Sequence, residues 1–90
     1  MNKQLENLRT KIDELDDNLF DILAKRILLV KRIGELKKQY GLDIVDEKRK
    51  DEKIKFFLKK AKTIKLPGSF AREFYTIIHA NSIEIQKETK

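Results

Sequence analysis

One arginine of this sequence stands at a helix position where an apolar side chain is expected. Arg26 fills a step of an apolar repeat, between Ile22 and Leu29. A guanidinium loses its hydration when it is buried, so an arginine in such a seam is stable only beside an anion. Either an acidic side chain of the protein or an anionic ligand can fill that role.

Lys37 is placed to share a pocket with Arg26. It follows eleven residues later, and at about 100° per residue this returns to within about 20° of the same direction, three turns further on. Arg9 precedes Arg26 by seventeen residues, which is about 25 Å along a helix axis and a turn of about 100°. On one chain Arg9 cannot touch the same small ligand, but from the other subunit of an antiparallel dimer it could.

Four further polar residues can join such a pocket. Asp46 and Arg49 stand one turn apart at the start of a predicted helix. Ser82 and Gln86 interrupt the apolar face of another helix at a spacing of i, i+4. Each also has a purely structural explanation, because Asp46 can be a helix cap, Gln86 a buried amide, and a seam arginine one half of an ion pair.

A long helix must position the first of these residues. Apolar side chains recur at steps of three and four over about five heptads, which predicts a helix over residues 3–40, about 55 Å long. A compact chain of this size is only about 30 Å across, so the helix must extend beyond its own monomer with the seam exposed. We therefore expect an intertwined homodimer. The alternative is a break near Gly34 that folds the helix back as a hairpin. The seam residues are Leu5, Leu8, Ile12, Leu15, Leu19, Ile22, Leu29, Ile33, Leu36 and Tyr40.

Two shorter helices are expected to follow. Gly41 can stop the first helix, and Asp46 can cap the second. Pro67 and the following glycine separate the second helix from a third, which Ser69 can cap. The third helix carries an apolar face of Phe70, Phe74, Ile77, Ile78 and Ile85. The predicted fold is all-α, with a long, a short and a medium helix over residues 3–40, 46–64 and 69–87 of a single domain, 1–90.

The composition argues against several classes of protein. The chain has no cysteine and one histidine, His79, which leaves no thiolate or histidine cluster for a metal. We expect neither a metal nor a cofactor. No apolar run approaches the length of a membrane span, and the first residues lack the apolar core of a signal peptide. A cytoplasmic location without a membrane partner is the expectation.

The formal net charge of +6 favours anionic partners. Most of the excess falls between Asp46 and Lys65, where eight lysines and one arginine face four carboxylates. A small polyanion and a nucleic acid are both candidates, and the simplest interpretation is a solvated lysine face on an amphipathic helix.

The chain resembles the all-helical class of chorismate mutases over nearly its whole length, in the segments LRTKIDELDDNLFDILAKR, GELKKQYG, DEKRK and NSIEIQ. The resemblance implies an intertwined homodimer of three-helix subunits. It also implies an isomerase that converts chorismate to prephenate, the branch-point step toward phenylalanine and tyrosine. Such a Claisen rearrangement needs no nucleophile, metal or proton transfer. It needs the reactive conformer to be held and the charge growing on the ether oxygen to be stabilised.

The resemblance also implies roles for individual residues. By position, Arg9 matches the arginine that the family supplies from the neighbouring subunit. Arg26 and Arg49 match its carboxylate-binding arginines. Lys37 and Gln86 match the pair that hydrogen-bonds the ether oxygen of the substrate. Chorismate, a small-molecule dicarboxylate, would then explain why several cations converge on one site.

Two further positions match the family and one departs from it. Asp46 falls near the ring hydroxyl of the substrate, and Ser82 near a carboxylate. Lys50 stands where the family usually has a glutamate that binds the ring hydroxyl. The loss of that glutamate favours isochorismate pyruvate lyase, an enzyme of the same fold. Ser82 favours the mutase, because the lyase is expected to carry a bulky aromatic residue there.

A function of a different class is a basic helical protein that binds nucleic acid through the lysines of the second helix. Its affinity would fall steeply with salt. It gives no reason for Arg26 in a seam or Gln86 in an apolar face, so we expect no nucleic-acid partner. His79 has no role in the mutase scheme and is expected at the surface or the rim of the site.

Overall fold

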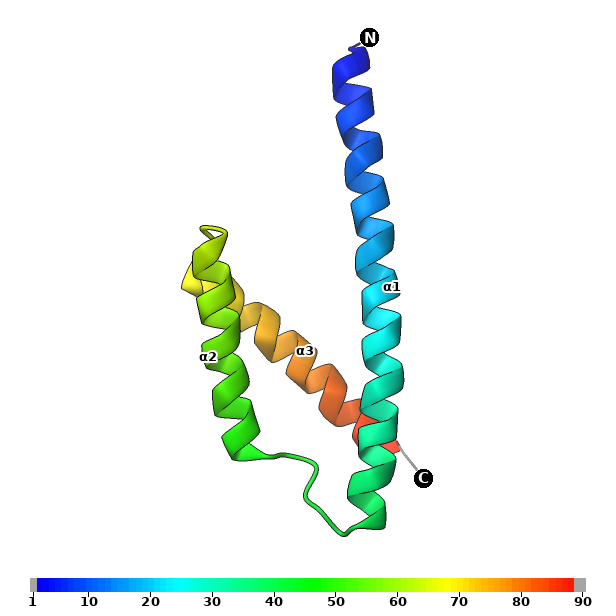
Figure 1. Ribbon diagram of the computed structural model, residues 1–90, viewed down its shortest axis with the longest axis vertical. Helices are drawn as coiled ribbons and strands as arrows, with labels where there is room; N and C mark the ends of the chain where they lie inside the picture. Colours follow the sequence, from blue (N-terminus) through cyan, green and yellow to red (C-terminus); the bar gives the residue numbers. More distant parts are fainter. Residues whose placement is uncertain (1, 89–90) are drawn as a thin grey trace.

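The computed structural model describes residues 2–88, which form three α-helices joined by two short connections (Figure 1). α1 spans Lys3–Gln39, α2 spans Glu47–Thr63 and α3 spans Gly68–Glu88. The predicted all-α fold with a long, a short and a medium helix is confirmed. α1 continues through Gly34 without a break, so the hairpin alternative is wrong.

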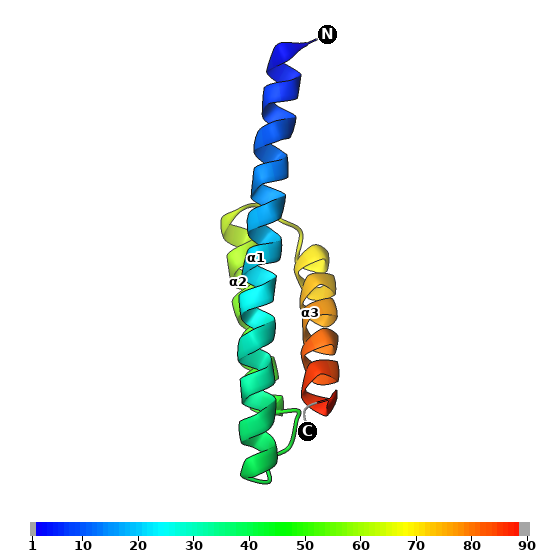
Figure 2. The same cartoon turned by 90° about the vertical axis from the view of Figure 1, so that its right-hand side faces the viewer.

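α3 holds the subunit together. It packs against both α1 and α2, whereas no Cα atom of α1 comes within 8 Å of one in α2. Figures 1 and 2 show the N-terminal part of α1 extending far beyond the other two helices. The extents are 59 × 27 × 15 Å and the radius of gyration is 16.9 Å, against about 12 Å for a compact chain of this length. The subunit is thus long and thin rather than compact.

Side-chain caps start the first two helices. Asn2 Oδ1 accepts a hydrogen bond of 3.1 Å from the backbone N–H of Leu5. Asp46 Oδ1 accepts one of the same length from the N–H of Arg49. Each cap satisfies one of the N–H groups that the first turn of a helix leaves without a partner.

α3 begins differently from the sequence-based expectation. The carbonyl of Pro67 accepts the first helical hydrogen bond, from the N–H of Ala71 at 3.2 Å. The helix therefore starts at Gly68, and the predicted capping role of Ser69 is wrong because Ser69 already lies in the first turn. Pro67, which precedes the helix, has no N–H of its own, so one donor fewer needs a partner at this end of the helix.

α1 ends in a Schellman motif. The N–H of Leu42 donates to the carbonyl of Lys37 at 2.8 Å, and the N–H of Gly41 donates to that of Lys38 at 3.3 Å. Gly41 has a φ of 64°, which glycine adopts without steric cost.

α2 ends in the same motif without a glycine. The N–H of Leu66 donates to the carbonyl of Ala61 at 2.9 Å, and the N–H of Lys65 donates to that of Lys62 at 3.2 Å. Lys65 takes the left-handed position, with a φ of 60°. A side chain with a Cβ is strained in this conformation.

The buried core is small. Among the described residues, the buried apolar side chains are Val30, Ala61, Ala71 and Tyr75, and no large side chain is more than 98% buried. The seam of α1 is largely exposed along its N-terminal half, as the length of the helix predicts. Its exposed members there are Leu5, Leu8, Ile12, Leu15, Leu19 and Ile22.

The face with which α3 packs is only partly the predicted one, because Ile78, Ser82, Ile85 and Gln86 are buried or half-buried as expected. Phe70, Phe74 and Ile77 were expected to form its buried face, yet they are 51%, 47% and 68% exposed. The fully buried residues of α3 are Ala71, Tyr75 and Ser82, and of these only Ser82 lies in the predicted face. Small and polar residues let the helix lie close to α1 and α2, and the bulkier apolar face remains uncovered.

The two Schellman motifs allow a matched test of backbone strain. Replacing Lys65 by glycine should raise the free energy of unfolding by up to about 1 kcal/mol, because the left-handed position then costs nothing. Replacing Gly41 by alanine should lower it by about 1 kcal/mol, since no atom lies within 4 Å of the added Cβ and only the backbone conformation is penalised.

Urea unfolding of both variants measures the two changes. Gly68→Ala is the control, because an added Cβ there lies 3.6 Å from Leu58 Cδ2, an ordinary contact, and its φ is not positive. The free energy of unfolding must rise in the Lys65 variant and fall in the Gly41 variant. A Lys65→Gly variant that is less stable than the parent would contradict the assignment of strain.

Candidate functional site

A cavity of about 250 Å³ opens between the three helices. α1 and α3 line it with residues at the same spacing, i, i+4, i+7 and i+11, which places four side chains of each helix along one stripe. α2 and the connection before it close the third side. The α1 residues are Arg26, Val30, Ile33 and Lys37, and the α3 residues are Tyr75, His79, Ser82 and Gln86; the remaining residues are Ile44, Asp46, Arg49, Lys50 and Lys53.

The cavity brings together most of the polar residues that the sequence singled out. The ones that line it are Arg26, Lys37, Asp46, Arg49, Lys50, Ser82 and Gln86. Arg9 is exposed and does not line the cavity. It belongs to the second turn of α1, within the part of the helix that projects beyond the body of the subunit.

Arg26 meets a hydroxyl rather than a carboxylate. Its Nη1 donates a hydrogen bond of 2.7 Å to Ser82 Oγ, which in turn donates to the carbonyl of Ile78 at 3.0 Å. Within residues 2–88, no carboxylate forms an ion pair with Arg26 inside 4.0 Å. A seam arginine can be stabilised by an acidic side chain or by an anionic ligand. This subunit shows no such ion pair within residues 2–88, so the anionic ligand is the explanation that is left.

Lys37 and Gln86 keep hydrogen-bonding capacity for a ligand. Lys37 Nζ donates to the carbonyl of Ile44, and an ammonium has two more protons to donate. Gln86 Nε2 donates to the carbonyl of Ser82 at 3.2 Å and has a second proton. Gln86 Oε1 is buried and accepts no hydrogen bond from the described residues.

The start of α2 adds charge at the open side of the cavity. The side chain of Arg49 is 67% exposed and its Nη1 lies 4.0 Å from Glu52 Oε2, a distance and exposure at which an ion pair contributes little. Asp46 is committed to capping the helix through the backbone of Arg49. Lys50 is half-buried and has no acidic partner within 4.0 Å in residues 2–88.

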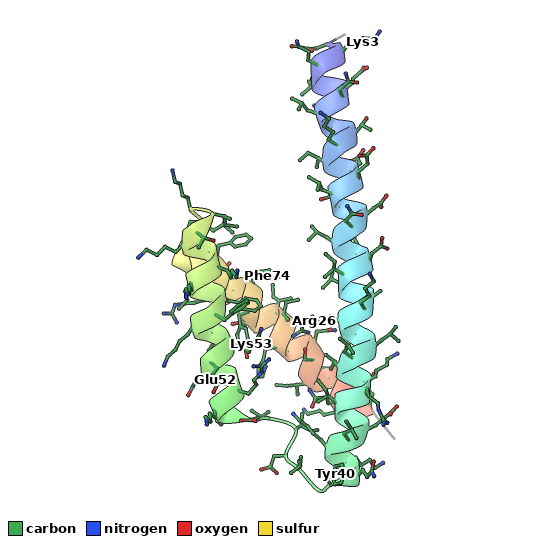
Figure 3. The ribbon with its side chains drawn as sticks, viewed as in Figure 1. Lys3, Arg26, Tyr40, Glu52, Lys53 and Phe74 are labelled. Carbon is green, nitrogen blue, oxygen red and sulfur yellow. The ribbon has the colours of Figure 1, made fainter. Side chains whose placement is uncertain are left out.

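Lys53 is a cavity residue that the sequence analysis missed. It follows Arg49 by four residues and Lys50 by three, so helical spacing alone could have found it. Figure 3 shows Arg26 and Lys53 on the facing sides of α1 and α2. Burial lowers the pKa of Lys53, and the positive charges of Arg49 and Arg26 lower it further.

Tyr75 and His79 form a stacked pair inside the cavity. Their ring centroids are 5.3 Å apart at an angle of 16°, and Tyr75 Oη and His79 Nδ1 are hydrogen-bonded at 3.2 Å. Burial raises the pKa of Tyr75. Burial also lowers the pKa of His79, and the charge of Lys50 adds to the effect. His79 was expected at the surface or the rim; it is half-buried, lines the cavity and stacks its ring on Tyr75.

Residues 2–88 contain no group of three histidine, cysteine, aspartate or glutamate side chains that could hold a metal ion. None of their helices is apolar enough over a sufficient length to cross a membrane.

Comparison with known proteins identifies relatives. Residues 8–87 match the family described as Chorismate mutase type II. The chain is 39% identical over 64 residues to the T-protein of Enterobacter agglomerans, covering 71% of this chain and 17% of that protein. It is 39% identical over 49 residues to the chorismate mutase of Methanocaldococcus jannaschii, covering 54% and 50%.

A third relative covers almost the whole chain. The bifunctional chorismate mutase/prephenate dehydratase of Aquifex aeolicus is 30% identical over 92 aligned positions, covering 98% of this chain and 25% of that protein. The matched region is thus no more than half of the length of each of these three relatives.

The environment of His79 predicts its titration. As the one histidine of the chain, it gives an unambiguous imidazole signal in proton NMR. The midpoint in the folded protein should lie below 6.5, because burial and the nearby cations disfavour the imidazolium. The folded state then binds this proton less readily than the unfolded state. The contribution of His79 to stability is therefore present above pH 6.5 and is lost as the pH falls through the folded pKa.

Two controls belong to this titration. In concentrated urea the midpoint should return to its ordinary value. Lys50→Met should raise the folded midpoint, since it removes a neighbouring positive charge, whereas Lys48→Met on the exposed side of α2 should leave it unchanged. A folded midpoint at or above the value measured in urea would contradict the placement of His79 in the cavity.

Proposed function

The chain belongs to the type II chorismate mutase family, and on that premise we propose that it converts chorismate to prephenate as an isomerase. The observation that carries the proposal is the cavity itself. Arg26, Lys37 and Arg49 are far apart in the sequence yet line one cavity with Gln86. Arg26 and Lys37 have no carboxylate partner within 4.0 Å among residues 2–88.

The arginines of the cavity suit a dicarboxylate. A guanidinium presents two parallel N–H groups that match the two oxygens of a carboxylate, so Arg26 and Arg49 can each hold one end of the substrate. Ser82 supports this role because it positions the Arg26 guanidinium through a 2.7 Å hydrogen bond. Holding both carboxylates favours the conformer in which the two reacting carbons are close.

Lys37 and Gln86 suit the ether oxygen. As the carbon–oxygen bond of chorismate breaks, negative charge grows on this oxygen. An ammonium and an amide N–H aimed at it stabilise the transition state more than the ground state. The contacts that Lys37 and Gln86 make with Ile44 and Ser82 support the assignment, because they fix both side chains without using up their donors. No cofactor or metal takes part.

A homodimer completes the proposal. The exposed seam of α1 and the exposed face of Phe70, Phe74 and Ile77 on α3 are apolar surfaces that a second copy can cover. The projecting N-terminal part of α1 would then carry Arg9 to the cavity of the partner subunit, which adds a cation to each site. A cytoplasmic location is part of the same proposal.

Isochorismate pyruvate lyase is the second candidate, and Lys50 is the observation that favours it. Lys50 lines the cavity where a carboxylate was expected to bind the ring hydroxyl. Against it stands Ser82, which is 7% exposed and hydrogen-bonded on both sides, to Arg26 and to Ile78. An assay that identifies the product separates the two, because the mutase releases prephenate and the lyase releases pyruvate.

Arg26 provides the test of the proposed activity. The wild type should consume chorismate and form prephenate, followed by the loss of chorismate absorbance and by product identification. Arg26→Ala should lower kcat/KM by about 100-fold or more, since it removes a charged double hydrogen bond to the substrate. Its melting temperature should change little, because the lost hydrogen bond to Ser82 is offset by weaker repulsion among the cations.

The matched control for Arg26 is Arg32→Ala on the same helix. The Arg32 side chain is 65% exposed and pairs with Glu35 at 2.9 Å. Its loss should leave both activity and stability nearly unchanged. A large drop in the stability of Arg26→Ala with unchanged affinity for the substrate would show that Arg26 is structural.

The shared site gives a second test. Arg9→Ala and Arg26→Ala homodimers should both be almost inactive. The two variants are then mixed so that they exchange subunits. Each heterodimer has one site in which both arginines are intact, so up to half of the sites in heterodimers should regain activity. Sedimentation measures the assembly, and labelled subunits verify the exchange. An active monomer, or no recovery after verified exchange, would contradict the shared site.

A further inference from the structure

The cavity carries more positive charge than a dicarboxylate needs. Five cationic side chains line it, against the one carboxylate of Asp46. That carboxylate already accepts a hydrogen bond from the backbone of Arg49. A substrate with two negative charges, held by Arg26, Arg49 and Lys37, would leave two cations without a counter-charge. These are Lys50 and Lys53.

Lys50 and Lys53 share one face of α2, since residues three apart on a helix are neighbours. Both are half-buried, and neither has a carboxylate within 4.0 Å among residues 2–88. No acidic side chain in the described part of the same helix forms an ion pair with either lysine. Glu52, for example, turns toward the exposed Arg49.

The Lys53 ammonium has only a weak partner. It lies 4.4 Å from the ring centroid of Phe56 and 5.5 Å from that of Phe57. A cation–π contact with these rings, of which Phe56 is exposed and Phe57 half-buried, is weaker than a charge-assisted hydrogen bond to a carboxylate. Burial and the charges of Arg49 and Arg26 lower the pKa of Lys53, so its charged form is disfavoured while the cavity is empty. An anion beside it would remove that penalty.

We propose that Lys50 and Lys53 form a subsite for a third anionic group, so that the cavity binds organic trianions more tightly than dianions of the same skeleton. The ligand class is a small tricarboxylate, or a dicarboxylate that carries one further acidic group. Such a ligand occupies the cavity in place of the substrate and acts as a competitive inhibitor. The inference rests on the charges that line the cavity, and it uses the proposed function only for the comparison with a dianion.

A matched pair of ligands tests the subsite. Propane-1,2,3-tricarboxylate differs from glutarate by one carboxylate on the central carbon. Titration calorimetry at pH 7.5, in a buffer without carboxylates and at fixed ionic strength, gives both dissociation constants. The wild type should bind the tricarboxylate at least about tenfold more tightly, as expected for one charge-assisted contact. The His79 imidazole signal should shift on binding, because His79 lines the same cavity.

Three variants assign the effect to Lys53. Lys53→Met keeps an unbranched side chain of nearly the same length without its charge and should reduce the preference for the tricarboxylate to about twofold or less. Lys53→Arg should keep it. Lys55→Met, which removes the same charge from an exposed position of α2, should also keep it, because general attraction between charges is not the cause. Circular dichroism confirms that each variant is folded.

The outcomes are separable from those of the proposed function. Equal dissociation constants for the two ligands, binding of neither, or an unchanged preference in Lys53→Met each overturn the subsite, even if chorismate is converted to prephenate. A preference that depends on Lys53 supports the subsite, even if chorismate is not converted. A preference lost equally in Lys55→Met overturns it, since net charge would then explain the result.

Discussion

The hydrogen bond from Arg26 Nη1 to Ser82 Oγ is the interaction on which the site depends. At 2.7 Å it joins α1 to α3, and it does so through a guanidinium that has no carboxylate partner within residues 2–88. A neutral hydroxyl directs the arginine without cancelling its charge. An internal ion pair would have held the helices together equally well and left nothing for a ligand.

The packing of α3 also serves to keep polar side chains available to a ligand. Its close contact with the other helices uses the stripe of Ala71, Tyr75 and Ser82, which continues to Gln86, and none of these residues is a large aliphatic one. A subunit built in this way buries few large side chains and leaves the seam of α1 in contact with solvent. Small domains bury little apolar surface and are therefore only marginally stable. The subunit therefore gives up internal burial to form a polar cavity, and a second copy of the chain is the proposed source of the missing burial.

The positive charges of the cavity also lower the stability of the empty protein. Lys53 and His79 both have a lowered pKa because burial and neighbouring cations disfavour their charged forms. Positive charges that repel one another destabilise the empty protein, and an anionic ligand relieves them. Such a trade between stability and function is common at binding sites. It accounts for cationic side chains that are half-buried without carboxylate partners.

The sequence by itself determined the helices, because their signals are local. The repeat of apolar residues predicts α1, and the Asp46 cap and the Gly41 stop depend on hydrogen bonds between residues a few positions apart. Local spacing likewise placed Arg26 with Lys37 on one stripe. The i, i+4 spacing placed Ser82 and Gln86 together on the inward side of α3, but only the tertiary structure decided that Tyr75 and His79 join them and that Phe74 stays exposed in the subunit. That choice depends on how closely three helices can approach one another, and no residue of α3 alone contains this information.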